Sequence, residues 1–302
     1  MRSMLFVRPR LSRQGGAPLS HRLPIARTVA GLALLLLAAS PTEAQVDGAH
    51  VPSPDAADGG YVCPRIPDAL ARRRTVAENP PPSAADLAAY HAYVEQLQVN
   101  DWAFLCRYRD ENRLLAAKPR PRVILFGDSI TENWRQRDPA PFVDGIVDRG
   151  VSGQTSAQML LRFSQDVIAL RPVVVQIMAG TNDIAGNTGP TSDAQYRDNI
   201  RAMVALARAN GIKVILASIP PARVFAWKPA LRPAQRIVAW NTWLRRYADA
   251  EGLVFVDYHA VLTDAAGGLR PAFDSDGTHP SSAGYRQMDP LFAQALAQAE
   301  RR

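Results

Sequence analysis

The sequence has few of the residues that mark several common classes of protein. Of its 302 residues only two are cysteine and five are histidine. Two cysteines so far apart make neither a disulfide-rich scaffold nor a zinc site with the usual ligand spacing. No apolar run reaches the roughly 20 residues that span a bilayer, and no block of lysine and arginine with interleaved aromatic residues follows residue 44. These absences exclude a multi-span membrane protein and argue against nucleic acid as a partner.

The formal net charge of +7 comes mostly from the first 44 residues, which contain six arginines and one acid. Residues 29–39 form an apolar run of the length found in signal peptides, and small residues at Thr42 and Ala44 offer a cleavage point before Gln45. The sequence therefore predicts a signal peptide over residues 1–44 and an exported protein, periplasmic or secreted, without stable membrane insertion. An uncleaved anchor is the alternative.

Composition divides the rest of the chain into three further parts. Residues 45–82 are rich in proline, aspartate and alanine, which is typical of a linker. Residues 83–117 predict a pair of helices, the first from Ser83 to about Gln98 and the second from Asp101 to about Ala117. Residues 118–302 form the predicted catalytic domain.

The two cysteines leave two interpretations open. Cys63 and Cys106 are an even number, which in an oxidising compartment permits a disulfide. Alternatively, Cys106 is a reduced core residue on an apolar face with Trp102 and Leu105.

Short runs rich in Val, Ile and Leu alternate with long amphipathic stretches beyond Pro121, which is typical of a parallel sheet covered by helices on both faces. The sequence therefore predicts an α/β protein, a flavodoxin-like three-layer α/β/α fold with a five-stranded parallel sheet, preceded by a short helical extension. The expected strands are residues 123–126, 145–149, 173–178, 213–218 and 253–257, and the expected helices are residues 156–170, 192–210, 233–251 and about 290–299.

A candidate nucleophile follows the first predicted strand. Ser129, in Gly-Asp-Ser-Ile-Thr, lies on the turn that leaves this buried strand, and ligands bind outside the carboxyl ends of strands in such sheets. His279 lies in the turn-rich loop Asp-Ser-Asp-Gly-Thr-His-Pro, three residues after Asp276. The Asp276 carboxylate can fold back to the imidazole, fix its tautomer and stabilise the imidazolium. Of the other histidines, His91 is expected on a surface helix and His259 at the rim of the sheet.

Two further strand ends supply donors for an oxyanion. The second strand ends in Arg-Gly-Val-Ser-Gly, where Gly153 frees the backbone to turn toward a ligand, and the third ends in Gly-Thr-Asn-Asp, which contains Asn182.

Together these four segments resemble, in order, the four blocks of the SGNH (GDSL) hydrolase family, in particular its bacterial lysophospholipase-like and platelet-activating-factor-acetylhydrolase-like esterases. The resemblance implies that Ser129 is the nucleophile, His279 the general base and acid, and Asp276 its orienting carboxylate. It implies an oxyanion hole made by the backbone amides of Ser129 and Gly153 with the Asn182 side chain. Asp148 departs from the family pattern, in which asparagine is common, and this puts the local hydrogen bonding of the second block in question.

The implied function is an exported serine esterase that acts on small or short-chain acyl esters without metal or cofactor. The alternatives are a carbohydrate O-deacetylase and a catalytically silent binding module. A calcium loop at Asp274 is disfavoured because Thr278 and Tyr285 stand where ligands are expected.

Several other residues have a structural interpretation. Trp240 and Trp243 are expected to pack in the core, Asp183 to brace Asn182 or the adjacent loop, and Arg149 to pair with a carboxylate. Residues 220–233, which include Phe225 and Trp227, either line the substrate pocket or form a proline-stiffened surface loop. The sequence does not indicate the oligomeric state.

Overall fold

The computed structural model describes residues 63–64 and 83–302. The predicted signal peptide (1–44) and nearly all of the predicted linker (45–82) lie outside these residues. No helix in the described ranges is long and apolar enough to cross a membrane.

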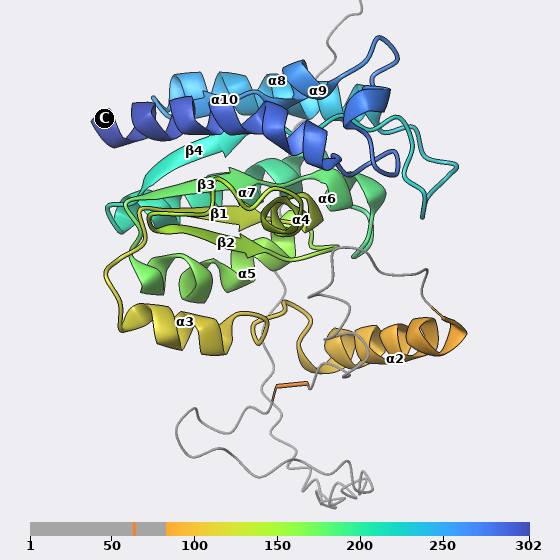
Figure 1. Ribbon diagram of the computed structural model, residues 1–302, viewed down its shortest axis with the longest axis horizontal. Coiled ribbons are helices and arrows are strands. Elements are labelled where there is room, and N and C mark those ends of the chain that lie inside the picture. Colours follow the sequence, from red (N-terminus) through yellow and green to blue (C-terminus); the bar gives the residue numbers. More distant parts are fainter. Residues whose placement is uncertain (1–62, 65–82) are drawn as a thin grey trace, which may run out of the picture. The chain divides into compact units, whose positions relative to one another are not determined.

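A five-stranded parallel sheet forms the centre of the fold, with the order β2-β1-β3-β4-β5 (Figure 1). The strand order reverses at β1, so that β2 and β3 flank it, as in flavodoxin-like sheets. All five predicted strands are confirmed to within one or two residues. Their bounds are β1 (Val123–Gly127), β2 (Ile146–Gly150), β3 (Val174–Met178), β4 (Lys213–Ala217) and β5 (Val254–Val256).

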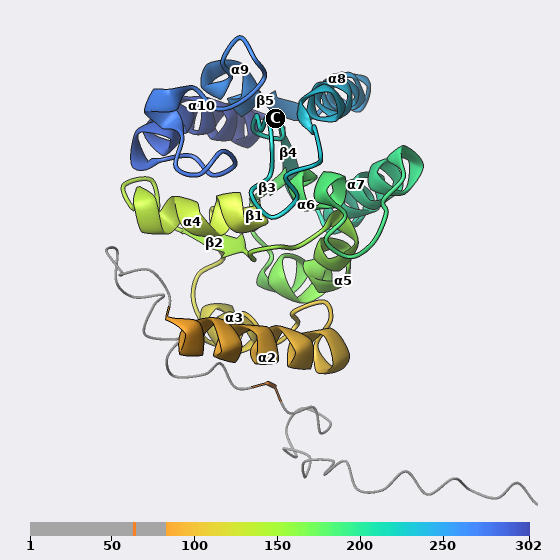
Figure 2. The ribbon, with the colours of Figure 1, turned by 90° about the vertical axis from the view of Figure 1, so that its right-hand side faces the viewer.

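Helices cover both faces of this sheet, which confirms the α/β/α layers (Figure 2). One core joins α5, α7 and α8 to alternate residues of β1 and β3, and the other joins α4, α9 and α10 to the remaining ones. The bounds are α2 (Ala84–Asn100), α3 (Arg109–Ala116), α4 (Ser129–Arg137), α5 (Ser156–Asp166), α6 (Thr181–Ala185), α7 (Asp193–Ala209), α8 (Ala234–Ala250), α9 (Tyr258–Leu262) and α10 (Ser282–Arg301), with short 3₁₀ helices η1 (Ile168–Leu170) and η2 (Pro271–Phe273).

The prediction of the second N-terminal helix, from Asp101 to about Ala117, is wrong over its first half. The chain forms turns from Asp101 to Tyr108, and α3 begins only at Arg109. The Asp101 carboxylate accepts hydrogen bonds from the backbone N–H groups of Leu105 and Cys106, and this local bonding competes with helix formation. A disulfide joins Cys106 to Cys63, which decides between the two interpretations of the cysteines.

The last helix starts eight residues earlier than predicted. Ser281 caps α10 by accepting a hydrogen bond from the Gly284 N–H, and Pro290 lies inside the helix. Proline removes one helical hydrogen bond, but the buried side chains of Tyr285, Met288 and Phe292 hold this helix on the sheet. The sequence pattern did not predict α4, α6 and α9 either.

Glycines at the ends of β1 and β2 allow α4 to pack directly on the sheet. A Cβ atom on Gly127 would lie 2.0 Å from Thr131 Oγ1, and one on Gly150 would lie 2.1 Å from Glu132 N. Larger residues would push α4 away. This close approach positions Ser129, the first residue of α4, at the carboxyl end of β1.

Candidate active site

Four segments that are far apart in the sequence meet at the carboxyl edge of the sheet. They are the β1–α4 turn with Ser129, the loop after β2 with Gly153, α6 with Asn182, and the loop before α10 with His279. Figure 2 looks onto this edge. The structure thus brings together the residues that the sequence singled out.

Ser129, His279 and Asp276 form a continuous hydrogen-bonded chain. Ser129 Oγ lies 2.8 Å from His279 Nε2, and His279 Nδ1 lies 2.8 Å from Asp276 Oδ2. The Ser129 residue is 9% exposed, whereas the side chains of His279 and Asp276 are 16% and 46% exposed. The arrangement can transfer the hydroxyl proton to the imidazole while a carboxylate holds the other ring nitrogen.

The loop from Asp274 to His279 holds acid and base as one unit. Asp274 Oδ1 accepts hydrogen bonds from the backbone N–H groups of Asp276 and Gly277, and Asp276 Oδ1 accepts from those of Thr278 and His279. The expected return of Asp276 onto the imidazole is present in the structure. Partial burial acts to raise the pKa of Asp276, but the hydrogen bonds from the His279 ring and backbone prevail and lower it to about 2. The carboxylate is therefore charged near neutral pH.

Three N–H groups are candidates for binding an oxyanion. Gly153 has a φ of +81°, a left-handed conformation that favours glycine. Within residues 83–302, no acceptor takes the backbone N–H of either Ser129 or Gly153. The Asn182 side-chain Nδ2 lies 3.2 Å from Asp128 Oδ2 and 3.0 Å from the Gln154 carbonyl oxygen. Asn182 thus points its amide nitrogen toward the turn that carries Ser129.

Asp128 links the nucleophile turn to Asn182. Its Oδ1 accepts the Ile130 N–H and so caps α4, while its Oδ2 accepts from Asn182. Burial raises the pKa of Asp128 to about 6, although the Ile130 hydrogen bond and the nearby His279 oppose the shift.

The turns from Asp101 to Tyr108 brace the loop that carries Gly153, a role that the sequence pattern does not predict. Tyr108 OH donates to the Gly150 carbonyl (2.5 Å), and Gln154 Nε2 donates to the Ala103 carbonyl (2.9 Å).

Glu132, on α4, also holds this loop, through Ser152. Its Oε2 accepts from both the backbone N–H and the hydroxyl of Ser152, while Arg107 donates to its Oε1. Neither brace follows a periodic pattern, so the sequence offered no signal for them.

Asp148 occupies the second block without disrupting it. Its Oδ1 accepts the Gly150 N–H at 2.7 Å, so the carboxylate supplies the bond that an asparagine oxygen would make. Burial raises the pKa of Asp148 to about 7, with nearby Glu132 adding to the shift and Arg149 opposing it.

We predict that Asp148→Asn stabilises the protein at pH 8. Aspartate ionises near pH 4 in the unfolded chain and near 7 in this fold, so the native state binds more protons between these values and its stability falls as pH rises. The free energy of unfolding of the variant should exceed that of wild type by roughly 1–3 kcal/mol at pH 8 and by much less at pH 4.5. Urea unfolding at the two pH values measures this. Asp249→Asn, at an exposed position, is the control, and an equal difference at both pH values would contradict the prediction.

Most other sequence interpretations concern packing. Trp240 is buried and stacks on Tyr196 with ring centroids 3.8 Å apart, and Trp243 stacks on Tyr247. Both are packing residues, as expected. Arg149 pairs with the Glu111 carboxylate at 3.6 Å.

Asp183 and His259 make their hydrogen bonds to residues other than Ser129 and His279. The Asp183 carboxylate accepts from the backbone N–H and hydroxyl of Ser156, at the start of α5, so it braces the helix that follows the Gly153 loop rather than Asn182. His259 lies on α9, where its backbone N–H donates to Ser218. His91 is exposed on α2, as expected. Across residues 63–64 and 83–302, no group of three or more His, Cys, Asp or Glu side chains is placed to hold a metal ion.

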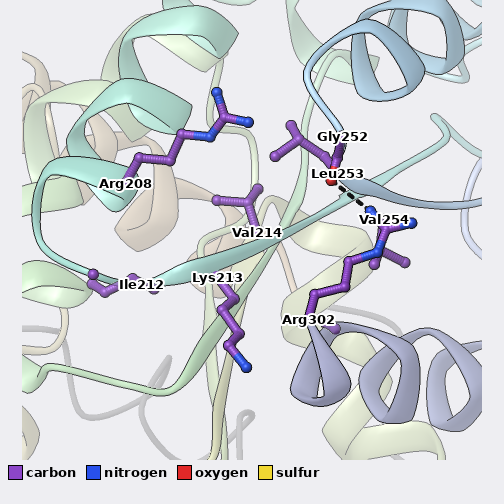
Figure 3. Close-up of a pocket in the computed structure, with 10 residues that line it drawn as sticks. Arg208, Ile212, Lys213, Val214, Gly252, Leu253, Val254 and Arg302 are labelled. Atoms are coloured by element: carbon purple, nitrogen blue, oxygen red, sulfur yellow. Dashed lines mark hydrogen bonds between the residues drawn. The ribbon is translucent and has the colours of Figure 1, made fainter.

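A cavity of about 250 Å³ lies at the opposite end of the sheet, where β4 and β5 begin (Figure 3). Its cations are Arg208, Lys213 and Arg302, and each is already bonded. Arg208 pairs with Glu251, Lys213 Nζ donates to the Glu300 carbonyl and Arg302 Nη1 donates to the Gly252 carbonyl. This cavity is separate from the candidate active site.

Comparison with known proteins agrees with this geometry. The model of the GDSL-like lipase/acylhydrolase family matches residues 125–287. The crystal structure of a protein assigned as an acylhydrolase from Bacteroides fragilis NCTC 9343 is 44% identical, with a TM-score of 0.63, over 66% of this chain and 98% of that one.

Two curated proteins match a smaller part of the chain. The uncharacterized lipoprotein YqeF of Bacillus subtilis is 34% identical over 33% of this chain and 48% of its own length. The esterase TesA of Pseudomonas aeruginosa is 29% identical over 46% of this chain and 62% of its own length. The match thus spans about half to three-fifths of these relatives. With the family model covering more than half of the chain, and with the expected fold present, the protein belongs to the GDSL-like lipase/acylhydrolase family.

Proposed function

We propose that the protein is a serine esterase that hydrolyses small or short-chain acyl esters through an acyl-enzyme intermediate. The observation that carries the proposal is the hydrogen-bonded chain from Ser129 through His279 to Asp276, which lies beside unbonded backbone amides at the carboxyl edge of the sheet. A nucleophile, a base, an orienting acid and anion donors in one place are the parts that acyl transfer needs.

In the first half-reaction, Ser129 Oγ attacks the ester carbonyl as His279 Nε2 takes its proton. The carbonyl oxygen becomes an oxyanion, which binds the N–H groups of Ser129, Gly153 and Asn182. The intermediate then collapses: the bond from the carbonyl carbon to the alcohol oxygen breaks, and His279 gives its proton to that oxygen. An acyl group remains on Ser129.

In the second half-reaction, water replaces the alcohol. His279 accepts a proton from the water as its oxygen attacks the acyl carbon, and the same three donors bind the second oxyanion. Collapse releases the acid, and the proton on His279 returns to Ser129 Oγ.

The candidate site lies near the surface, where an ester can reach it. Asp276 is half exposed and His279 is reached from the surface, so the triad lies at the rim of the molecule. Hydrolysis of an acetyl ester on a carbohydrate follows the same two half-reactions with a larger alcohol as the leaving group. The test below therefore includes such an ester.

The test is the hydrolysis of p-nitrophenyl acetate, butyrate and octanoate, and of an acetylated polysaccharide, by the protein and its Ser129→Ala variant without added metal. Turnover that requires Ser129 and falls with chain length is expected. Faster release of acetate from polysaccharide than from the aryl ester would identify a carbohydrate O-deacetylase. Folded wild type without turnover on any of these esters would contradict the proposal and favour a binding module.

We also propose that the protein is exported. The signal-like residues 1–44 support this, as does the disulfide between Cys63 and Cys106, because disulfides persist in oxidising compartments. Mass spectrometry of the form made by its own host should find a chain that begins at Gln45, whereas an intact amino terminus would contradict cleavage.

We predict that Asn182→Ala lowers kcat by about 10²-fold with little change in KM. The variant loses a hydrogen bond to the oxyanion, and this bond is stronger in the transition state than in the bound substrate. Steady-state kinetics on p-nitrophenyl acetate measures the effect. Asn210→Ala, in which the lost side-chain amide is exposed at the end of α7, should retain wild-type rates. Activity of Asn182→Ala equal to wild type would disprove the assignment of this donor.

A further inference from the structure

Asn187 contacts two of the three residues assigned to the oxyanion hole. Its Nδ2 donates to Asn182 Oδ1 at 2.8 Å and to the Gly153 carbonyl oxygen at 3.3 Å. Its own Oδ1 accepts the indole N–H of Trp227 at 3.0 Å. A chain of side chains thus runs from Trp227 through Asn187 to Asn182.

The orientation of every amide in this chain is forced by its neighbours. The indole of Trp227 is only a donor, so the oxygen of Asn187 faces it and the nitrogen faces the other way. The Gly153 carbonyl is only an acceptor, which agrees with that orientation.

Asn182 is oriented by the same logic. Its oxygen meets the Asn187 nitrogen, and its nitrogen meets Asp128 and the Gln154 carbonyl, both acceptors. A rotation of the Asn182 amide by 180° would place its oxygen against Asp128 Oδ2 and the Gln154 carbonyl oxygen.

The end of α6 brings Asn187 back onto Asn182. Gly186 adopts a left-handed conformation (φ 68°), and the Asn187 backbone N–H donates to the Asn182 carbonyl. This is the hydrogen-bond pattern of a Schellman motif. Residues five apart are therefore adjacent through both backbone and side chain.

The segment between β4 and α8 brings Trp227 to this cluster. Figure 2 shows it crossing in front of the ends of β3 and β1. The Trp227 ring stacks on buried Phe225 with centroids 5.0 Å apart, yet the residue is 42% exposed. Trp227 is thus an anchored ring at the rim of the site, whose N–H is fixed in direction.

We infer that Asn187 and Trp227 are positioning residues for the oxyanion hole: Trp227 fixes Asn187, and Asn187 fixes the donor of Asn182 and the backbone of Gly153. The inference rests on the proposed function. It assigns residues 220–233 a role in catalysis beyond lining a pocket. With its nitrogen held beside the Ser129 turn, Asn182 can exchange one of its two N–H bonds, to Asp128 or to the Gln154 carbonyl, for the oxyanion with little movement when the charge develops.

The first test is Asn187→Asp, which keeps the size of the side chain and its acceptor for Trp227 but places oxygen against Asn182 Oδ1 and the Gly153 carbonyl. We expect kcat for p-nitrophenyl acetate to fall by about 10- to 100-fold, with KM changed by less than about twofold. Asn210→Asp makes the same change at the exposed end of α7 and should leave both constants unchanged. Unchanged kcat in a folded Asn187→Asp variant would overturn the inference.

The second test is Trp227→Phe, which keeps an aromatic ring for Phe225 and removes the N–H. We expect kcat to fall by about 3- to 10-fold, and we expect no further fall when the same change is made in Asn187→Ala. Trp243→Phe on α8 is the control. A change in KM alone, present in both backgrounds, would show that Trp227 acts by touching substrate and would overturn its assignment here.

A double-mutant cycle links Asn187 to Asn182. Asn187→Asp should lower kcat by a smaller factor in the Asn182→Ala background than in wild type, and an equal factor in both would overturn the coupling.

A measurement that does not need turnover separates this inference from the proposed function. In the ¹⁵N-labelled protein, the side-chain amide signals of Asn182, assigned by their loss in Asn182→Ala, should shift in Asn187→Ala. Unshifted signals would contradict the inference whether or not the wild type hydrolyses esters.

Discussion

Ser129→Ala is expected to abolish ester hydrolysis, with kcat lower by on the order of 10⁴- to 10⁶-fold. In the proposed mechanism the hydroxyl oxygen forms the acyl bond, and within the described residues no second serine hydroxyl lies within hydrogen-bond distance of the His279 ring. The helix should remain in place, because Asp128 rather than Ser129 caps α4. The measurement is kcat on p-nitrophenyl acetate together with the melting temperature.

The variant Ser275→Ala is a matched control. Ser275 lies in the loop of Asp276 and its hydroxyl accepts a bond from Arg137 at 2.7 Å, away from the reacting atoms. It should retain most of the activity. Members of a triad act as a unit, so Ser129→Ala combined with His279→Ala should be no worse than either variant alone. Residual turnover within about tenfold of wild type in Ser129→Ala would exclude Ser129 as the nucleophile.

Asp276→Asn is expected to lower kcat by about 10³-fold while the loop keeps its shape. An asparagine oxygen can still accept the backbone N–H groups of Thr278 and His279. Its amide nitrogen, however, would donate to His279 Nδ1 and place the ring proton on Nε2, where the hydroxyl proton of Ser129 must go. The half-exposed position of Asp276 lets water share its role, so we expect a smaller loss than for a fully buried acid.

Asp274→Asn provides the control within the same loop. The Asp274 side chain accepts two backbone N–H groups, which an asparagine oxygen would also accept, and it does not contact the His279 ring. Its kcat should stay within about twofold of wild type. If both variants lost activity equally, the effect would come from the loop and not from the tautomer of His279.

The sheet could be predicted because each strand carries its own signal. Strands β1 and β3 are buried along their whole length and therefore appear as short continuous apolar runs. The helices α5, α7 and α8 were also predictable, because each is long and buries one face.

Two helix boundaries were predicted wrongly because particular contacts override the local pattern. Asp101 binds the backbone and turns a helical stretch into turns, while the apolar face of α10 carries the helix through Pro290. Both effects depend on contacts that the local pattern does not contain.

The positions of Ser129, Gly153 and Asn182 could be predicted for a topological reason. Parallel strands end at the same edge, so residues after different strands converge there. The supporting residues could not be predicted in this way, because the contacts of Glu132 with Ser152 and of Tyr108 with Gly150 join segments 20 and 42 residues apart. Asn187 carried a local signal, since a glycine that ends a short helix returns the next residue toward its start.

The braces from Ala103, Arg107 and Tyr108 mean that the folding unit is larger than the stretch recognised by the family model. A fragment cut to residues 125–287 would lose these braces, the first two residues of β1 and the part of α10 that contains the buried Phe292 and Leu296. It would retain Ser129, Asp276 and His279 but expose apolar surface on one face of the sheet. The stretch that folds together therefore reaches at least from the turns near residue 101 to the end of α10, and the disulfide of these turns extends it to Cys63.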